Sequence, residues 1–182
     1  MTGPVWYCTR WNDLTRRPIA GHAWIDADDA RGRRARHEFF DVVDAETIED
    51  DLPRPRWVIH SSASFGVDFF DAHGSIWRTV VYRWTDERLW RLTTTDYTYP
   101  DGEQHWDLPD ATLEVEATVL PDGTGQLVVD DATAGTKSVS EFSDHDASSR
   151  WLEEPAFGDW DALTDPGPSA SEIAKAARRG VL

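Results

Sequence analysis

The chain has 182 residues and a formal net charge of −16; 40% of the residues are hydrophobic and 29% are charged. This composition excludes a wholly disordered chain, and no apolar run approaches the ~20 residues of a membrane-spanning helix. The single cysteine, Cys8, excludes an internal disulfide framework and a multi-cysteine metal site. Because the N-terminus lacks the basic and apolar segments of a secretory signal, we expect a cytoplasmic protein with no membrane partner.

Short hydrophobic runs between Gly, Pro and Asp turn signals predict strands along the first half of the chain. We expect strands from Val5 to Trp11, from Ala20 to Ile25 and from Arg36 to Val43. The run from Asp44 to Glu49 then offers an N-cap residue and one helical turn, which the prolines that follow would end.

The centre of the chain has the strongest strand pattern. Predicted strands cover Trp57 to Ser62, Phe65 to Phe70, Ile76 to Trp84 and Leu89 to Tyr99, with only short polar turns between them. Strands joined by turns of this length pair with their neighbours in the chain. The sequence therefore predicts an antiparallel meander here.

Beyond Pro109, apolar and acidic residues alternate from Leu113 to Val119. A strand with this pattern buries one face and leaves Glu114 and Glu116 on the solvent side. Further strands are predicted from Gln126 to Asp130 and from Lys137 to Phe142.

The last part of the chain is rich in Pro, Gly and Ser, and its one predicted helix runs from Glu172 to Arg179. Ser169 or Ser171 can cap this helix. We therefore expect a mainly β fold: residues 1–146 as a single antiparallel domain of about eight strands, either a β-barrel or a strongly curved sheet. Residues 147–182 form a loop-rich extension that ends in a short helix and packs on the same domain.

The sequence carries no recognised catalytic signature. It has no Gly-x-Ser-x-Gly elbow, phosphate-binding loop or dinucleotide fingerprint. Its six histidines lack metal-ligand spacing, and Asp144-His145-Asp146 is more typical of a hydrated turn than of a metal site. We predict no catalytic residue, metal or cofactor, and we interpret His60 as a core histidine with satisfied hydrogen bonds and Cys8 as a buried thiol.

Charge and tryptophan content give the strongest functional indication. Residues 101–170 hold 17 acidic groups, with Lys137 and Arg150 as their only basic ones. Such a field repels nucleic acid and anionic membranes and attracts a basic protein. Three of the ten tryptophans, Trp106, Trp151 and Trp160, lie in or beside this acidic stretch, and tryptophan is frequent at binding hot spots. Acidic surplus also serves solubility, however, and loop tryptophans also close the ends of barrels.

We therefore hypothesise an inhibitory protein-binding module, of the bacterial immunity-protein or antitoxin type. It would neutralise a toxin with a cationic substrate cleft, such as a nuclease or an NAD-consuming enzyme. This requires the carboxylates of residues 101–170 to converge on one exposed flank. The predicted partner-binding residues are Trp106, Glu114, Glu116, Asp130, Asp131, Asp144, Asp146, Trp151 and Trp160.

The alternative is a lipocalin-like barrel that binds a small molecule, or a barrel enzyme without a cofactor. The strand from Ile76 to Trp84 carries large side chains on both faces, as a cavity-lining strand would. Under this alternative, Tyr82, Trp84 and Trp90 line the cavity.

Overall fold

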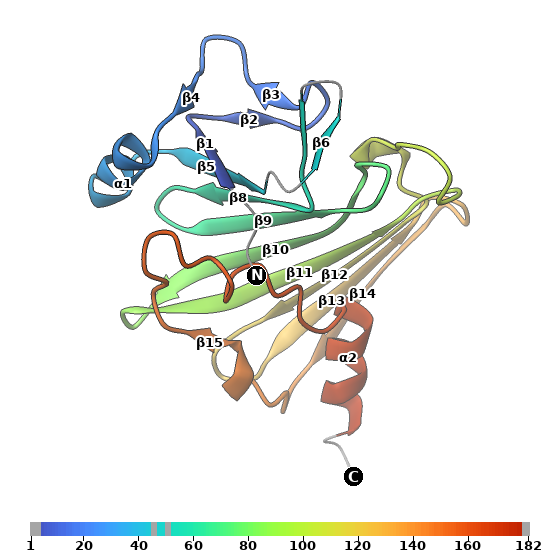
Figure 1. The fold of residues 1–182 in the computed structure, drawn as a ribbon. Coiled ribbons are helices and arrows are strands. Elements are labelled where there is room, and N and C mark those ends of the chain that lie inside the picture. Colours follow the sequence, from blue (N-terminus) through green and yellow to red (C-terminus); the bar gives the residue numbers. More distant parts are fainter. Residues whose placement is uncertain (1–4, 45–46, 50–51, 180–182) are drawn as a thin grey trace.

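A computed structural model describes residues 5–44, 47–49 and 52–179 of the chain. Most of its strands belong to one large antiparallel sheet (Figure 1), and the C-terminal segment runs across one face of that sheet. The prediction of a mainly β fold with a short C-terminal helix is confirmed. No helix among the described residues has the length and apolar character needed to cross a membrane.

The strands of the large sheet have the following order from edge to edge. They are β14 (Thr136–Phe142), β13 (Gly125–Asp131), β12 (Leu113–Val119), β11 (Arg88–Thr98), β10 (Ile76–Thr85), β9 (Phe65–Phe70), β8 (Trp57–Ser61), β5 (Phe40–Asp44), β1 (Val5–Cys8) and β4 (Trp24–Ile25). A short strand, β15 (Trp151–Leu152), pairs with the start of β11.

The remaining elements are small. Two hairpins pair β2 (Trp11–Asn12) with β3 (Arg17–Pro18) and β6 (Thr47–Glu49) with β7 (Leu52–Arg54). The helices are α1 (Ala27–Ala35) and α2 (Ala170–Arg179), and single 3-10 turns lie at Leu108–Asp110 and Ser148–Arg150.

The sheet order confirms the predicted meander and extends it. From β8 to β14 every strand pairs with its neighbour in the chain. The prediction of a barrel or a curved sheet holds only in part: the strands form one large antiparallel sheet, but β14 and β4 lie at opposite ends of the strand order and the sheet does not close into a barrel. A barrel would bury one face of the sheet by closure. Here the C-terminal segment covers that face instead, and β4, with two residues, offers little for β14 to pair with.

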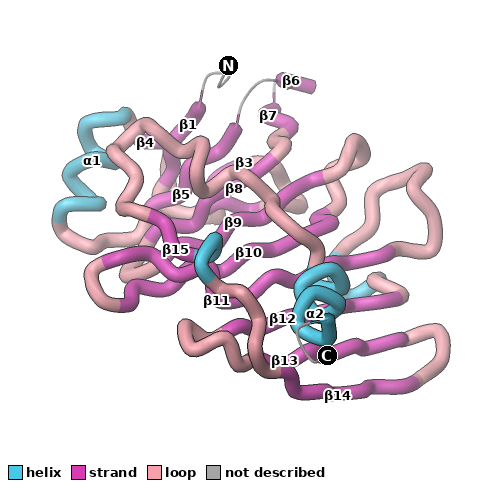
Figure 2. The backbone as a smooth tube through the Cα atoms, turned by 90° about the horizontal axis from the view of Figure 1, so that it is seen from below, coloured by secondary structure: helices cyan, strands magenta, loops and turns pink. Residues whose placement is uncertain are grey.

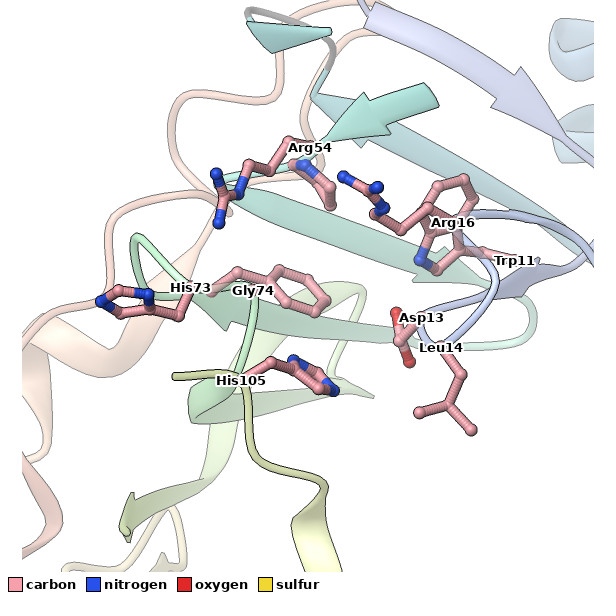
Figure 3. A pocket seen from close by; sticks show the side chains of 10 residues that line it. Trp11, Asp13, Leu14, Arg16, Arg54, His73, Gly74 and His105 are labelled. Carbon is pink, nitrogen blue, oxygen red and sulfur yellow. The ribbon is translucent and has the colours of Figure 1, made fainter. Parts of the chain in front are cut away.

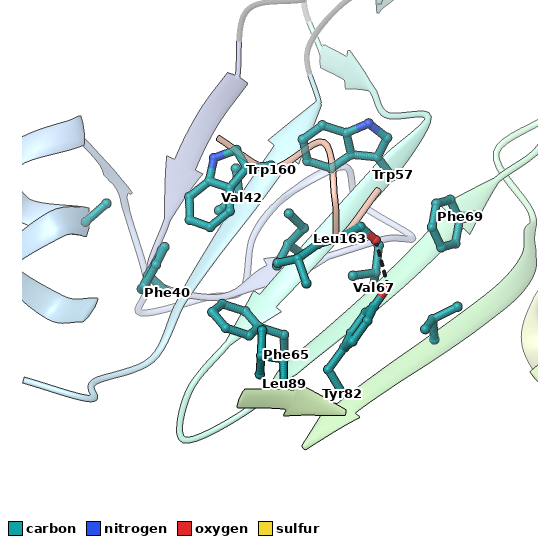
Figure 4. Close-up of a cluster of buried hydrophobic side chains, with 13 residues drawn as sticks. Phe40, Val42, Trp57, Phe65, Val67, Phe69, Tyr82, Leu89, Trp160 and Leu163 are labelled. Atoms are coloured by element: carbon teal, nitrogen blue, oxygen red, sulfur yellow. Dashed lines mark hydrogen bonds between the residues drawn. The ribbon is translucent and has the colours of Figure 1, made fainter. Parts of the chain in front are cut away.

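The main core lies on the face of the sheet under the C-terminal segment, which we call the inner face. Figure 4 shows Trp160 and Leu163 of that segment among side chains from β5, β8, β9, β10 and β11. Both are at most 1% exposed. Burying side chains of this size stabilises a fold by about 1.5–3 kcal/mol each, so the segment is part of the core.

Polar side chains of the inner face bind the backbone of this segment. Arg78 Nη1 donates to the carbonyl of Gly167 over 2.9 Å, and Arg91 Nη2 donates to that of Asp165 over 2.6 Å. The Tyr82 hydroxyl donates to the carbonyl of Leu163 over 3.2 Å. These bonds satisfy carbonyl groups of an irregular segment that lacks strand partners.

Helix α2 begins where its capping residues predict. The Ser169 amide donates to Glu172 Oε2 over 2.8 Å, and the Glu172 amide donates to Ser169 Oγ over 3.2 Å, which is a capping box. The helix packs Ala170 and Ile173 against inner-face residues of β11 and β12. Figure 2 shows α2 lying over the part of the meander that contains β12.

Two N-terminal elements differ from the sequence prediction. Helix α1 was not predicted, although Asp26 caps it by accepting from the Asp29 amide over 2.8 Å. Its nine residues bury only Ala30, so it lacks the apolar stripe by which helices are recognised. Thr47–Glu49 forms a strand with β7 where we expected a helical turn; residues 45–46 of that turn lie outside the described residues.

A smaller core lies on the opposite, outer face, at its N-terminal end. There the loop around β2 covers part of β1, β5 and β8, and Cys8, Trp11, Val43, Val58, Phe70 and Ile76 pack together. Along β12, β13 and β14 the outer face carries mainly polar side chains, with Val128 and Val139 among them. Both candidate sites lie on this side of the molecule.

Candidate functional site

The register of the last strands places acidic side chains in adjoining rows on the outer face. Directly paired residues of antiparallel strands point to the same side. One row consists of Tyr97, Glu114, Asp130 and Lys137. The next consists of Thr95, Glu116, Val128 and Val139, and the third ends in Thr118, Gln126 and Glu141.

We call Glu114, Glu116, Asp130 and Glu141, taken together, the acidic face. Helix α2 packs on the other side of these strands, so it leaves this side uncovered. Glu114 and Glu141 are exposed and the other two are half-buried. Lys137 lies among them, with Nζ 3.0 Å from Asp130 Oδ2. This hydrogen bond and the charge of Asp130 raise the pKa of Lys137, and the charges of Glu114 and Glu116 add to the shift.

Three of the predicted binding residues, Glu114, Glu116 and Asp130, therefore lie together. The structure adds Glu141, which the sequence reasoning missed. The alternation of Lys137, Val139 and Glu141 with serines along the last strand was the available signal. This alternation could not show that Glu141 joins the other carboxylates, because that depends on the register between β14 and β13.

The other predicted carboxylates do not join this face. Asp131 points to the inner side and accepts from the Ala134 amide over 2.8 Å in the β13–β14 turn. Asp146 accepts from the Ser148 amide over 3.0 Å, and Asp144 accepts from the Ser143 hydroxyl over 2.9 Å. All three make hydrogen bonds to groups within three residues, as acidic residues in turns and loops commonly do.

The three loop tryptophans have different positions. Trp160 is 1% exposed in the main core, so in this structure it offers almost no surface for the predicted contact with a partner. Trp151 is half-buried and packs edge-to-face on Trp90, with 4.8 Å between ring centroids. Trp106 is half-buried in the loop after β11, and its indole N–H donates to Asp101 over 3.3 Å.

The alternative cavity is replaced by packed side chains. Tyr82 is 0% exposed and Trp90 1%, and they belong to two different core clusters. The Trp90 indole N–H donates to the carbonyl of Val119 over 2.7 Å, while half-buried Trp84 packs against the cluster of Tyr82. The C-terminal segment and α2 cover the inner face, so these three side chains pack in or against the core. In the described part of the chain they do not line a lipocalin-like cavity.

A histidine between two carboxylates lies on the outer face, beside the loop that follows β1. His60 Nδ1 is 3.1 Å from Asp41 Oδ1, and its Nε2 is 3.0 Å from Asp68 Oδ2. Asp41 also accepts from the Trp11 amide over 2.6 Å, and Asp68 accepts from the Thr79 hydroxyl over 2.7 Å. The group thus connects β5, β8, β9 and β10 with the loop.

The two carboxylates determine the charge of His60. Burial by itself would lower its pKa, but the hydrogen bonds to Asp41 and Asp68 and their negative charges outweigh burial and raise the pKa to about 10. The imidazole is therefore protonated at neutral pH, and both nitrogens are engaged. This agrees with the expectation of a satisfied histidine, and a protonated ring has no lone pair with which to act as a base.

A groove adjoins this group (Figure 3). It consists of two cavities of about 250 Å³ each, which share Asp13, Leu14, Gly74 and His105 as lining residues. Figure 3 shows the residues that line the first cavity. Trp11, Phe70, Arg16 and Arg54 line one end. The other end is more apolar, with Ile76, Trp106 and Leu108.

Asp13 is the unusual residue of the groove. Burial and, secondly, the charge of Asp68 raise its pKa to about 6. Its Oδ1 atom is buried without a hydrogen-bond partner among the described residues. A carboxyl group that titrates near neutrality in a cleft is a candidate for ligand binding or proton transfer. Sequence reasoning missed it because a chain with 34 acidic residues offers no local sign of which one is buried.

One further reactive group, the thiol of Cys8, is buried in the outer-face core. Cys8 is 0% exposed, and burial, with the charge of Asp41 as a second cause, raises its pKa to about 12. It is a thiol and not a thiolate at neutral pH. Within the described ranges, no three His, Cys, Asp or Glu side chains come together as metal ligands would.

No protein-family model, curated protein or solved structure matches this chain. Function must therefore be argued from the acidic face and the groove themselves.

Proposed function

We propose that this chain is an inhibitory protein-binding module that uses its acidic face to bind a basic protein. The supporting observation is that Glu114, Glu116, Asp130 and Glu141 occupy adjoining positions on a sheet surface that α2 leaves uncovered. A partner would meet several carboxylates at once, on paired strands whose backbone is already ordered. This arrangement favours rapid association with a cationic surface.

The proposed target is a toxin whose substrate cleft is cationic, as in enzymes that bind nucleic acid or NAD. The threonine, valine and glutamine side chains between the carboxylates would fill the contact surface. Polyanions would be repelled by the same field, which is why we propose a protein target and not nucleic acid. As an immunity protein or antitoxin, the chain would act in the cytoplasm of the cell that makes it.

The test compares a variant of the acidic face with a control of equal charge. The face variant combines Glu114→Gln, Glu116→Gln and Glu141→Gln. The control combines Asp86→Asn, Glu103→Gln and Asp159→Asn, which are exposed or half-buried and lie off this face. Each protein is immobilised and exposed to extract of the native cells, and the retained proteins are identified by mass spectrometry.

We expect a basic protein to be retained by the wild type and by the control and lost from the face variant. Titration calorimetry with that protein should show an affinity that falls as salt is raised. Equal retention by the face variant, or an affinity insensitive to salt, would contradict the proposal.

A second candidate function is the binding of a small molecule in the groove. The buried, unpartnered oxygen of Asp13 favours it, because a ligand N–H or O–H could supply the missing hydrogen bond. The apolar end of the groove would hold the rest of the ligand. Thermal-shift measurements with a panel of small amines and alcohols test this idea. A compound that stabilises the wild type and not Asp13→Asn supports it; equal shifts in both proteins count against it.

A further inference from the structure

Strand β14 forms one edge of the large sheet. Among the described residues it pairs only with β13, through all seven of its residues (Figure 2). Long unprotected edge strands are uncommon, because their free N–H and C=O groups can pair with another chain. Val139, at the centre of this strand, is 57% exposed. An exposed valine on a free edge points to a partner strand.

The side chains of β14 are arranged symmetrically about Val139. Ser138 and Ser140 flank it, and Lys137 and Glu141, which have opposite charges, lie two residues away on either side. Lys137, Val139 and Glu141 all point to the outer face. An antiparallel copy of the same strand would therefore meet a complementary sequence at each position.

We propose that β14 pairs with β14 of a second copy of this chain, about a two-fold axis at Val139. In this register Val139 faces Val139 of the other copy, and each Lys137 faces a Glu141. The serines face one another at the positions between. The contact is the same on both copies, as a closed dimer with two-fold symmetry requires.

The register holds whichever backbone groups of β14 point outward. Opposite residues of antiparallel strands alternate between pairs that exchange hydrogen bonds and pairs that do not. If Val139 has its backbone groups outward, the two valines exchange them. If it does not, Ser138 and Ser140 exchange them instead, and the side-chain pairing is unchanged.

Charge complementarity favours a second copy over an unrelated strand. Lys137 would lie between Asp130 of its own chain and Glu141 of the other, so each copy provides a cation where the other has an excess of acid. Opposite charges directly across a strand pair are favourable, and like charges are not. A seven-residue strand pair is small for a permanent interface, so we expect a reversible, concentration-dependent dimer.

The experiment is sedimentation equilibrium over a concentration series, with the single charge reversals Lys137→Glu and Glu141→Lys. Each reversal places two pairs of like charges at the contact, and each should weaken dimerisation about tenfold or more. Glu103→Lys, an exposed change of the same kind away from the strand, should dimerise like the wild type. Thermal melts verify that all variants fold.

Mixing the two reversed variants is the decisive measurement. In a mixed pair, the glutamate introduced at position 137 of one chain faces the lysine introduced at position 141 of the other. The native residues face one another at the second position, so both contacts become favourable. We expect the mixture to dimerise at concentrations where each variant alone is monomeric. A wild type that stays monomeric up to about 1 mM, reversals without effect, or no recovery on mixing would each overturn the proposal.

Discussion

At the scale of single residues, His60 shows how neighbours determine chemistry. The ring is 31% exposed, yet each nitrogen lies against a carboxylate, and Asp41 itself is 1% exposed. Two buried or half-buried acids within reach of one imidazole make the cation the stable form. His60 is thus a structural cation held between Asp41 and Asp68 beneath the loop.

The pH dependence of stability follows from this pairing. Because the folded pKa of about 10 lies above the ordinary value of 6.5, His60 contributes its full stabilisation below about pH 6.5 and loses it as the pH rises through 10. We expect His60→Gln to lower the free energy of unfolding by about 2 kcal/mol at pH 6; this is less than for a fully buried pair, because the ring is partly solvated.

Urea denaturation of the wild type and of His60→Gln at pH 6, 8 and 10 measures this effect. The difference between the two proteins should shrink with increasing pH. His22→Gln, at an exposed histidine, is the control and should change stability by less than about 0.5 kcal/mol. A difference that stays constant up to pH 10 would show that His60 is not held as a cation.

At the scale of elements, the C-terminal segment depends on one glycine. Gly167 has a φ of 61°, and a Cβ atom built on it would overlap the guanidinium of Arg91. Arg91 is 8% exposed and donates to Asp165 of the same segment. A side chain at this position would therefore have to displace the buried Arg91.

Gly167→Ala should lower the free energy of unfolding by about 3 kcal/mol, since it adds the displacement of Arg91 to backbone strain. Gly135 is a matched control, because its φ is 63° and no atom lies within 4 Å of its built Cβ. Gly135→Ala should cost only about 1 kcal/mol of backbone strain. Equal losses in chemical denaturation would mean that the contact with Arg91 contributes nothing.

At the scale of the whole molecule, the C-terminal segment takes the place of barrel closure. Trp160 and Leu163 complete the core of the inner face, and α2 covers the strands beyond them. The inner face is thereby covered along most of the sheet. The outer face carries the acidic face on β12, β13 and β14, which holds four of the 17 acidic groups of residues 101–170.

Trp160→Ala tests whether the segment is core or binding surface. Because Trp160 is buried, Trp160→Ala should lower the free energy of unfolding by about 3–5 kcal/mol. The control is Phe39→Ala, at a side chain that is 56% exposed. It should lower the free energy of unfolding by less than about 1 kcal/mol. Differential scanning calorimetry compares the two variants with the wild type. If Trp160→Ala kept the native melting temperature, the residue could not be part of the core.

Much of the fold could be predicted because its signals are local. The strands from Trp57 to Thr98 and from Leu113 to Phe142 follow from β-forming residues, alternation and short turns, and the capping box at Ser169 determines where α2 begins. Helix α1 was missed because it buries one residue. Whether the sheet closes could not be decided from the sequence, because closure depends on which elements cover a sheet, and local patterns do not contain that information.

The site was predictable only in part, for the same reason. Alternation alone was enough to place Glu114 and Glu116 in solvent, whereas Glu141 joined them only through the register of two hairpins. Trp160 looked like Trp106 and Trp151 in the sequence, and only the path of the C-terminal segment buries it. Asp13 gained its raised pKa from burial and from Asp68, 55 positions away in the chain.

The sequence by itself determined the β-rich character, the meander, the C-terminal helix and the concentration of negative charge, because each depends on composition or on neighbours within a few residues. Tertiary structure alone decided which carboxylates share a surface, which tryptophans are buried, what charge His60 carries and which strand is left at the edge. These properties depend on burial and on distances between residues far apart in the chain, which only the folded arrangement sets.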